Sequence, residues 1–164
     1  MIIISPMLTT DWEAVKKIYE EGIATGNATF QQTAPAWQEW DRAHIASCRL
    51  VAKDNDTVAG WAALSPVSVR PVYAGVAEVS IYIAMQERGK GIGSLLMQSL
   101  VASSEQNGFW TLQAGIFPEN KASISLHLKS GFRIVGRRER IGKMKNTWRD
   151  NVFLERRSRI AGVG

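Results

Sequence analysis

Residues 88–93, Arg-Gly-Lys-Gly-Ile-Gly, combine basic side chains with glycines and stand between an apolar segment and a segment of helical periodicity. A strand that turns through glycines into a helix leaves several backbone N–H groups without acceptors at the positive end of the helix dipole. Such a turn can bind phosphate, because glycine lets the backbone approach an anion closely. The spacing differs from that of the P-loop and of the dinucleotide-binding fingerprint. The segment therefore predicts a phosphate-binding turn of another kind, with an ordinary glycine-rich turn as the alternative.

A carboxylate stands at the start of the apolar segment that leads to this turn. Glu78 precedes Val79–Ala84, which is rich in β-branched and aromatic residues and predicts a buried strand. A carboxylate beside a bound substrate can accept the proton of an attacking amine, and partial burial would make it a stronger base. Glu78 is therefore the candidate general base, and a solvent-facing carboxylate at the start of a strand is the alternative.

Two segments resemble motifs of one enzyme family. Residues 88–93 have the order Arg-x-x-Gly-x-Gly of the pyrophosphate loop of the GNAT superfamily of acetyl-CoA-dependent N-acetyltransferases. Residues 120–132 are similar to the family's second motif, Asn-x-x-Ser-x-x-Leu-His-x-x-x-Gly-Phe. The resemblance covers most of the chain, from the first predicted strand to Asp150, and it implies acetyl-CoA as the co-substrate.

The resemblance also implies which residues contact acetyl-CoA. The pantetheine arm would pair with the backbone of the strand before the turn, where the N–H of Ile81 or Ile83 would polarise the thioester carbonyl. His127 stands where many family members carry a tyrosine near the departing sulfur. It could protonate the thiolate, since the ordinary pKa of histidine is about 6.5, or only contact the cofactor. Asn120 could bind the pantetheine or cap the helix that follows it. The predicted catalytic residues are Glu78 and His127, and the predicted cofactor contacts are Ile81, Tyr82, Ile83, Arg88, Gly89, Lys90, Gly91, Ile92, Gly93, Ser94 and Asn120.

Shorter matches point to one branch of the superfamily, the phosphinothricin and methionine sulfoximine acetyltransferases. Residues 77–83, Ala-Glu-Val-Ser-Ile-Tyr-Ile, resemble that branch's strand, and Arg70-Pro71-Val72-Tyr73 resembles its Arg-x-x-Tyr element. The resemblance implies a small amino-acid-like amine as substrate, with Arg70 paired to its carboxylate or phosphinate-like group. A surface arginine of a loop is the alternative for Arg70. The predicted substrate contacts are Phe30, Val69, Arg70, Pro71, Tyr73, Glu78, Val79 and Ser80.

Composition fits one soluble domain. The 164 residues are 45% apolar and 21% charged, with a net charge of +5 and one cysteine, Cys48. There is no signal segment, no membrane-spanning run and no metal-ligand spacing, so we expect a cytoplasmic protein without a metal site. Basic residues concentrate after position 132. A sheet edge with a solvated face that attracts anionic ligands explains them better than a nucleic-acid surface does.

Periodicity and turn residues predict a single α/β domain over residues 1–157 and a frayed tail at 158–164. The predicted order β-α-α-β-β-β-α-β-α-β-β gives a central mixed sheet, mostly antiparallel and flanked by helices, in agreement with the GNAT fold that the motifs imply. In that fold the strand after Glu78 and the strand at 110–117 run parallel and splay apart. A capping box at Thr10–Glu13 is expected to start the first helix, and Trp37 and Trp40 are expected in the core.

The sequence thus predicts an acetyl-CoA-dependent N-acetyltransferase that acts by direct attack in a ternary complex, and the resemblance implies a homodimer. Methionine sulfoximine, methionine sulfone or phosphinothricin is the expected substrate class. One alternative is the same chemistry on a protein N-terminus or a polyamine. The other is a module that binds CoA or nucleic acid without turnover.

Overall fold

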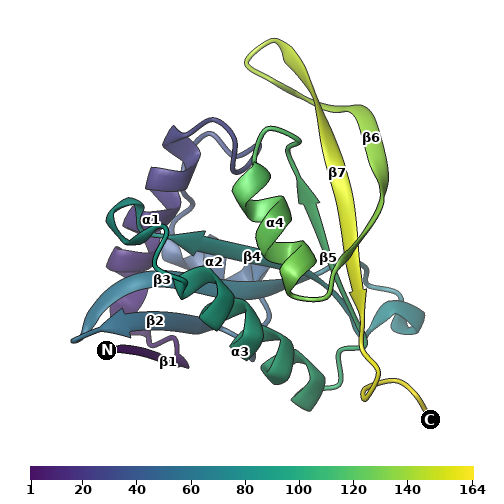
Figure 1. Cartoon of the computed structure of the whole chain (residues 1–164), viewed down its shortest axis with the longest axis horizontal. Coiled ribbons are helices and arrows are strands. Elements are labelled where there is room, and N and C mark those ends of the chain that lie inside the picture. Colours follow the sequence, from purple (N-terminus) through teal and green to yellow (C-terminus); the bar gives the residue numbers. More distant parts are fainter.

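The protein is a seven-stranded mixed sheet with helices on both faces, and the computed structural model describes residues 1–164 (Figure 1). The strands lie in the order β1-β2-β3-β4-β5-β7-β6, and only β4 and β5 run parallel. The strands are β1 (Ile2–Pro6), β2 (Leu50–Asp54), β3 (Thr57–Pro66), β4 (Val76–Ile83), β5 (Thr111–Ile116), β6 (Arg133–Met144) and β7 (Thr147–Arg157). The helices are α1 (Trp12–Ala24), α2 (Trp37–Ala43), α3 (Ile92–Gln106) and α4 (Lys121–Lys129). The predicted order of elements and the mixed α/β fold are confirmed.

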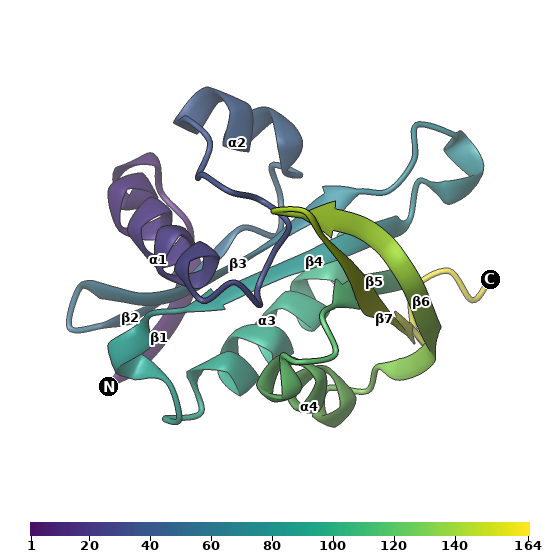
Figure 2. The same ribbon diagram turned by 90° about the horizontal axis from the view of Figure 1, so that it is seen from above.

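Each face of the sheet has its own hydrophobic core. Helices α1 and α2 cover one face, and α3 and α4 cover the other (Figure 2). Val79 belongs to the core under α3, whereas Tyr82 packs against the aromatic core under α1 and α2. Side chains of a strand alternate between faces, so Glu78 and Ser80 share the α1/α2 face with Tyr82. The aromatic core consists mainly of Trp12, Tyr19, Trp40 and Trp61, with Trp37 packed against it, so both predicted core tryptophans lie there.

Two local expectations differ from the structure. A 3₁₀ turn at Thr9–Asp11 precedes α1 in place of a capping box at Thr10, because the Asp11 carboxylate accepts from the Leu8 N–H at 2.8 Å and pairs with Lys53 at 2.9 Å. Strand β4 starts at Val76, so Glu78 lies inside the strand and not at its beginning.

The first residue of the C-terminal tail is buried, and most of residues 159–164 are exposed. Ser158 is 4% exposed, its hydroxyl donates to Glu105 Oε2 at 2.5 Å, and its N–H donates to the Trp110 carbonyl at 2.7 Å. Arg157 donates to the carbonyls of Ala161 and Gly162. Tertiary hydrogen bonds therefore hold Ser158, and the fraying of the residues after it stays a prediction.

The parallel pairing of β4 with β5 is short. It joins only Val76–Glu78 to Thr111–Gln113. Beyond that point β4 continues along β3, and β5 continues along β7. From Val79 to Ile83 one edge of β4 therefore has no strand beside it, which agrees with the predicted splay.

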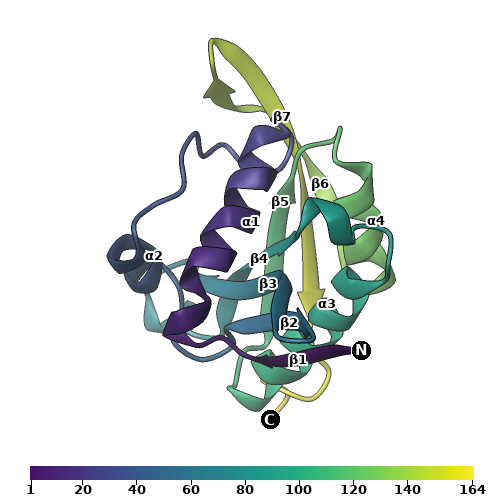
Figure 3. The same cartoon turned by 90° about the vertical axis from the view of Figure 1, so that its left-hand side faces the viewer.

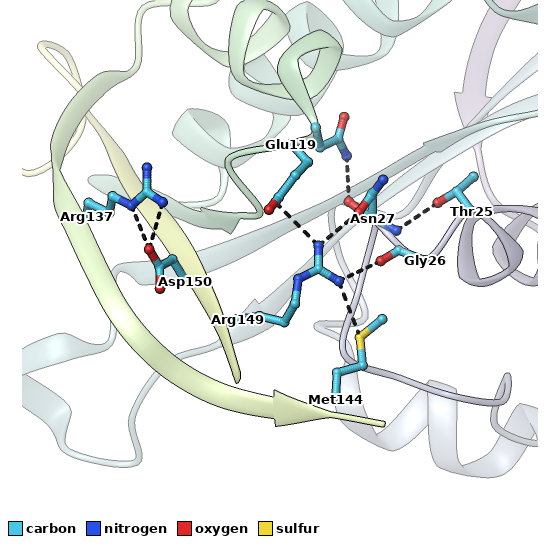
Figure 4. A network of polar contacts seen from close by, with 9 residues as sticks. Thr25, Gly26, Asn27, Glu119, Arg137, Met144, Arg149 and Asp150 are labelled. Atoms are coloured by element: carbon cyan, nitrogen blue, oxygen red, sulfur yellow. Dashed lines mark hydrogen bonds and ion pairs between the residues drawn. The ribbon is translucent and has the colours of Figure 1, made fainter. Parts of the chain in front are cut away.

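Arg149 on β7 joins three distant parts of the chain (Figure 4). Its Nη1 donates to the Gly26 carbonyl and its Nη2 to Asn27 Oδ1, both at 2.9 Å, and the side chain is 14% exposed. The guanidinium lies 3.9 Å from the centre of the Phe117 ring and 3.4 Å from the Glu119 carboxylate. In the backbone view of Figure 3 the β6–β7 hairpin reaches past the end of α1. Arg149 thus holds the loop after α1 against the loop after β5.

Replacing Arg149 with Met should lower the free energy of unfolding by about 1–3 kcal/mol, because partly buried acceptors lose a charged donor. Chemical denaturation measures the change. Arg137→Met is the matched control, since Arg137 is an exposed arginine of the same hairpin whose surface ion pair is with Asp150 (Figure 4). We expect the control to stay close to the parent protein, and equal losses in both variants would contradict this role of Arg149.

Candidate active site

A cleft of about 1110 Å³ opens where β4 and β5 diverge. It is bounded by β4, the segment 87–94, β5 and the start of α4. Most of the predicted site residues line it: Phe30, Glu78, Val79, Ser80, Ile81, Tyr82, Ile83, Arg88, Gly89, Gly91, Ile92, Gly93, Ser94, Asn120 and His127. The cleft lining does not include Val69, Arg70, Pro71, Tyr73 or Lys90. Tertiary structure therefore gathers three separate sequence segments around one opening.

The glycine turn before α3 has the geometry of an anion site. Gly89 and Gly91 have φ of 77° and 80°, the left-handed region that other residues adopt only with strain. The N–H groups of Gly89, Lys90 and Gly91 donate to no acceptor in the chain, and the first-turn N–H groups of α3 have none within the helix. A Cβ at Gly93 would stand 3.2 Å from Leu126 of α4, so glycine there allows the two helices to approach. Several donors therefore converge at a helix N-terminus, and these residues fit a diphosphate.

The two basic side chains of this turn behave differently. Arg88 is exposed and lines the cleft. Lys90 instead pairs with Glu87 at 2.9 Å and is not among the residues that line the cleft. Of the two basic side chains of the turn, only Arg88 therefore contributes its positive charge to the cleft lining.

Glu78 lines the cleft from inside β4, where it lies opposite Ser65 of β3 and Gln113 of β5. Its side chain is exposed, so the expected partial burial is wrong. The reason is the divergence of the strands, which leaves open space beside the position where β4 and β5 separate. The carboxylate forms no ion pair within the chain and is therefore available to a substrate.

His127 on α4 is 2% exposed and packs edge-on against Phe132 at 4.9 Å. Its Nδ1 lies 2.7 Å from the Ser123 carbonyl, which can only accept, so Nδ1 carries the proton. Nε2 then holds a lone pair and has no partner in the chain. Burial lowers the pKa of His127 below its ordinary value of 6.5, which favours this neutral form.

Asn120 and Tyr82 are held by contacts within the chain. Asn120 is the N-cap of α4, where its Oδ1 accepts from the Ser123 N–H at 3.2 Å and its Nδ2 donates to the Asn27 carbonyl at 3.1 Å. The Tyr82 ring stacks on Trp61 at 5.0 Å, and burial raises the pKa of its hydroxyl. At the open edge of β4, Tyr82 can therefore contact a ligand through its backbone and not through its ring.

The predicted substrate residues divide into two groups. Phe30 lines the cleft and meets Phe117 edge-on at 4.8 Å. Val69, Arg70, Pro71 and Tyr73 lie together on the exposed loop between β3 and β4. The Arg70 guanidinium covers the Tyr73 ring at 5.5 Å. Within one chain this loop does not reach the cleft.

Sequence reasoning missed several residues that line the cleft: His44, Ser65, Gly115, Arg138 and Asn151. His44 follows α2, and the Ile45 N–H donates to the Leu64 carbonyl at 2.8 Å, which brings His44 beside Ser65. Ser65 in turn pairs with Glu78. Side chains of the last hairpin alternate between the two faces of the sheet. This alternation could have identified Arg138 and Asn151 as cleft residues if the register with β5 had been known.

Acidification should destabilise the protein partly through His127. Below pH 6.5 His127 binds a proton in the unfolded chain but stays neutral in the folded chain, because folding lowers its pKa. The stability of the fold is therefore unaffected by His127 protonation above pH 6.5, and it decreases as the pH falls toward the lower pKa that His127 has in the folded protein. Denaturation at pH 8, 7, 6 and 5 should show a shallower loss of stability in His127→Phe than in the parent protein. Identical pH slopes in the two proteins would contradict the assignment.

None of the helices combines the length and apolar composition needed to cross a bilayer.

Residues 10–132 match the acetyltransferase (GNAT) family. The chain is 30% identical over 152 residues to the L-methionine sulfoximine/L-methionine sulfone acetyltransferase of Pseudomonas aeruginosa, an alignment that covers 88% of each chain. It is 30% identical over 157 residues to the phosphinothricin N-acetyltransferase of Streptomyces viridochromogenes, covering 93% of this chain and 86% of that protein.

A solved structure shows the same architecture with the cofactor in place. The phosphinothricin acetyltransferase of Sinorhizobium meliloti, in complex with acetyl-CoA, superposes with a TM-score of 0.87 at 28% identity, covering 99% of this chain and 91% of the other. The splayed strands, the glycine turn and these similarities all indicate the same family. The chain therefore belongs to the GNAT family of acetyltransferases and is an acetyl-CoA-dependent N-acetyltransferase.

Proposed function

We propose that this enzyme acetylates the α-amine of a small amino-acid-like substrate of the methionine sulfone, methionine sulfoximine or phosphinothricin class. The observation that carries the proposal is a single cleft with a diphosphate-binding turn beside α3 and the Glu78 carboxylate on the α1/α2 face of β4. The names of the relatives support the substrate class. The predicted homodimer and cytoplasmic location stay predictions.

The turn and β4 position the acyl donor. Acetyl-CoA, when bound, supplies an activated acetyl group. The N–H groups around Gly91 and Arg88 would hold its diphosphate, and the open edge of β4 would pair with the pantetheine arm. A backbone N–H of Ile81 or Ile83 would stabilise the negative charge that develops on the carbonyl oxygen.

Glu78 accepts a proton from the substrate ammonium, directly or through one water, so that the amine can attack. Its place on the α1/α2 face puts it across the sheet from the diphosphate turn. The amine and the acyl donor therefore approach the gap from opposite faces. Direct attack needs no covalent enzyme intermediate.

His127 acts in this proposal as a hydrogen-bond acceptor and not as the general acid. Its Nδ1–H is committed to the Ser123 carbonyl, and its lowered pKa opposes the protonated form that could donate from Nε2. The departing thiolate would take the proton that the attacking nitrogen loses as the amide forms, directly or through water. Asn120, already bonded at both ends of its amide, would contribute mainly by holding α4 in place.

Thiol release from acetyl-CoA should be seen with methionine sulfone and should be absent with a ribosomal peptide or a polyamine. Glu78→Gln should lower kcat by about 10²–10⁴-fold, the usual contribution of a general base, with the KM for acetyl-CoA unchanged. Glu139→Gln, a change of the same kind outside the cleft, is the control. Unchanged turnover in Glu78→Gln would remove Glu78 from this role, and turnover with the peptide alone would overturn the substrate class.

Gly91→Ala should raise the KM for acetyl-CoA by about 5–30-fold, because alanine pays roughly 1–2 kcal/mol to adopt the left-handed backbone. Acetylpantetheine, which lacks the diphosphate, should be used equally well by the variant and the parent. Gly136→Ala is the matched control, since Gly136 has open space around it and no positive φ. Equal losses with both acyl donors would argue against a diphosphate site at this turn.

A further inference from the structure

Arg138 on β6 is an exposed arginine of the cleft lining that has no acidic partner. Its Nε donates to Asn151 Oδ1 at 2.8 Å. The guanidinium lies 4.7 Å from the centre of the Phe153 ring, and its Nη1 and Nη2 make no hydrogen bond or ion pair within the chain. Both terminal nitrogens of the guanidinium are therefore available to a ligand in the cleft.

The surroundings hold this guanidinium in one orientation. Asn151 is 8% exposed, and its Oδ1 fixes the Nε side of the guanidinium. A Cβ at Gly115 of β5 would stand 2.8 Å from Asn151 Nδ2 and 3.0 Å from Arg138 Nη2. Glycine at this position thus leaves room for an amide donor and a guanidinium donor side by side above β5. Donors in that arrangement suit a carboxylate or another oxyanion.

Three other arginines of the same hairpin are already neutralised or committed. Arg133 pairs with Glu155, Arg137 pairs with Asp150, and Arg149 is held by the two loops described above. Figure 4 shows the last two of these. Arg138 differs from its neighbours because the side chain beside it is a neutral amide.

The face of the sheet decides which ligand can reach Arg138. Ala114 and Ile116 of β5 belong to the core under α3 and α4, so Gly115 between them faces the α1/α2 side. Gln113, two residues earlier, pairs with Glu78 on that same side. Gln113 and Gly115 are roughly 7 Å apart along β5. Glu78 on β4 pairs with the first of them and Arg138 on β6 reaches the second, so both side chains stand on the same face of the cleft. The diphosphate turn lies at the start of α3, on the other face.

We propose that Arg138, oriented by Asn151, binds the carboxylate or phosphinate-like anion of the substrate and so selects amino acids over plain amines. The inference rests on the proposed function and names the residue that determines its substrate class. It assigns to Arg138 the contact that the family resemblance implies for Arg70, whose loop lies outside the cleft in one chain.

The test compares methionine sulfone with its decarboxylated analogue, 3-(methylsulfonyl)propan-1-amine. In the parent enzyme kcat/KM should favour the amino acid. In Arg138→Gln this preference should fall by about 10–100-fold, the range for losing a charged hydrogen-bonded contact, with the KM for acetyl-CoA unchanged. Arg138→Lys should keep part of the preference. Arg137→Gln, which removes the same charge from the adjacent position, should change it less than about twofold.

Calorimetric titration of methionine sulfone into the enzyme with CoA separates binding from turnover. Loss of affinity in Arg138→Gln alone, at an unchanged melting temperature, supports the inference even if no amino acid is acetylated and the proposed function fails. The inference is overturned if the parent enzyme does not distinguish the two amines in either assay. It is also overturned if Arg138→Gln keeps the preference, or if Arg70→Gln removes it while Arg138→Gln does not.

Discussion

The site depends on where the pairing between β4 and β5 stops. Three residue pairs hold the two strands together, and beyond Glu78 each strand follows a different neighbour. The unpaired edge of β4 would be costly if it were buried without a partner, because backbone N–H and C=O groups need acceptors and donors. An extended ligand arm can satisfy this edge. The divergence therefore creates both the space for the cofactor and the backbone groups that bind it.

In the proposed function the sheet also separates the two reactants. The turn that fits a diphosphate lies at the start of α3 on one face, whereas Glu78 and Arg138 lie on the face of α1 and α2. The aromatic stack of Tyr19, Trp61 and Tyr82 anchors β4 from that second face. Because β4 is held by packing on both sides and by β3, its backbone can serve as a rigid reference for both ligands.

The basic C-terminal hairpin has a structural explanation for much of its charge. Arg133, Arg137 and Arg156 form ion pairs, and Arg149 binds carbonyl groups of the loop after α1. This agrees with the interpretation of the hairpin as a solvated sheet edge. Asp150 accepts from the Arg140 N–H and from Arg137, and these hydrogen bonds lower its pKa. The remaining positive charge toward the cleft is that of Arg138.

Local sequence determined much of this protein. Val79–Ile83 as a strand, the left-handed glycines before α3 and Asn120 as an N-cap all follow from interactions between residues close in the chain, so their patterns could be read directly. Only tertiary structure decided which distant side chains share the cleft. Arg138 and Asn151 face Gly115 because of the register among β5, β7 and β6, and a shift of one residue would turn them to the opposite face. The exposure of Glu78 likewise follows from the divergence of two strands more than 30 residues apart, which no local periodicity encodes.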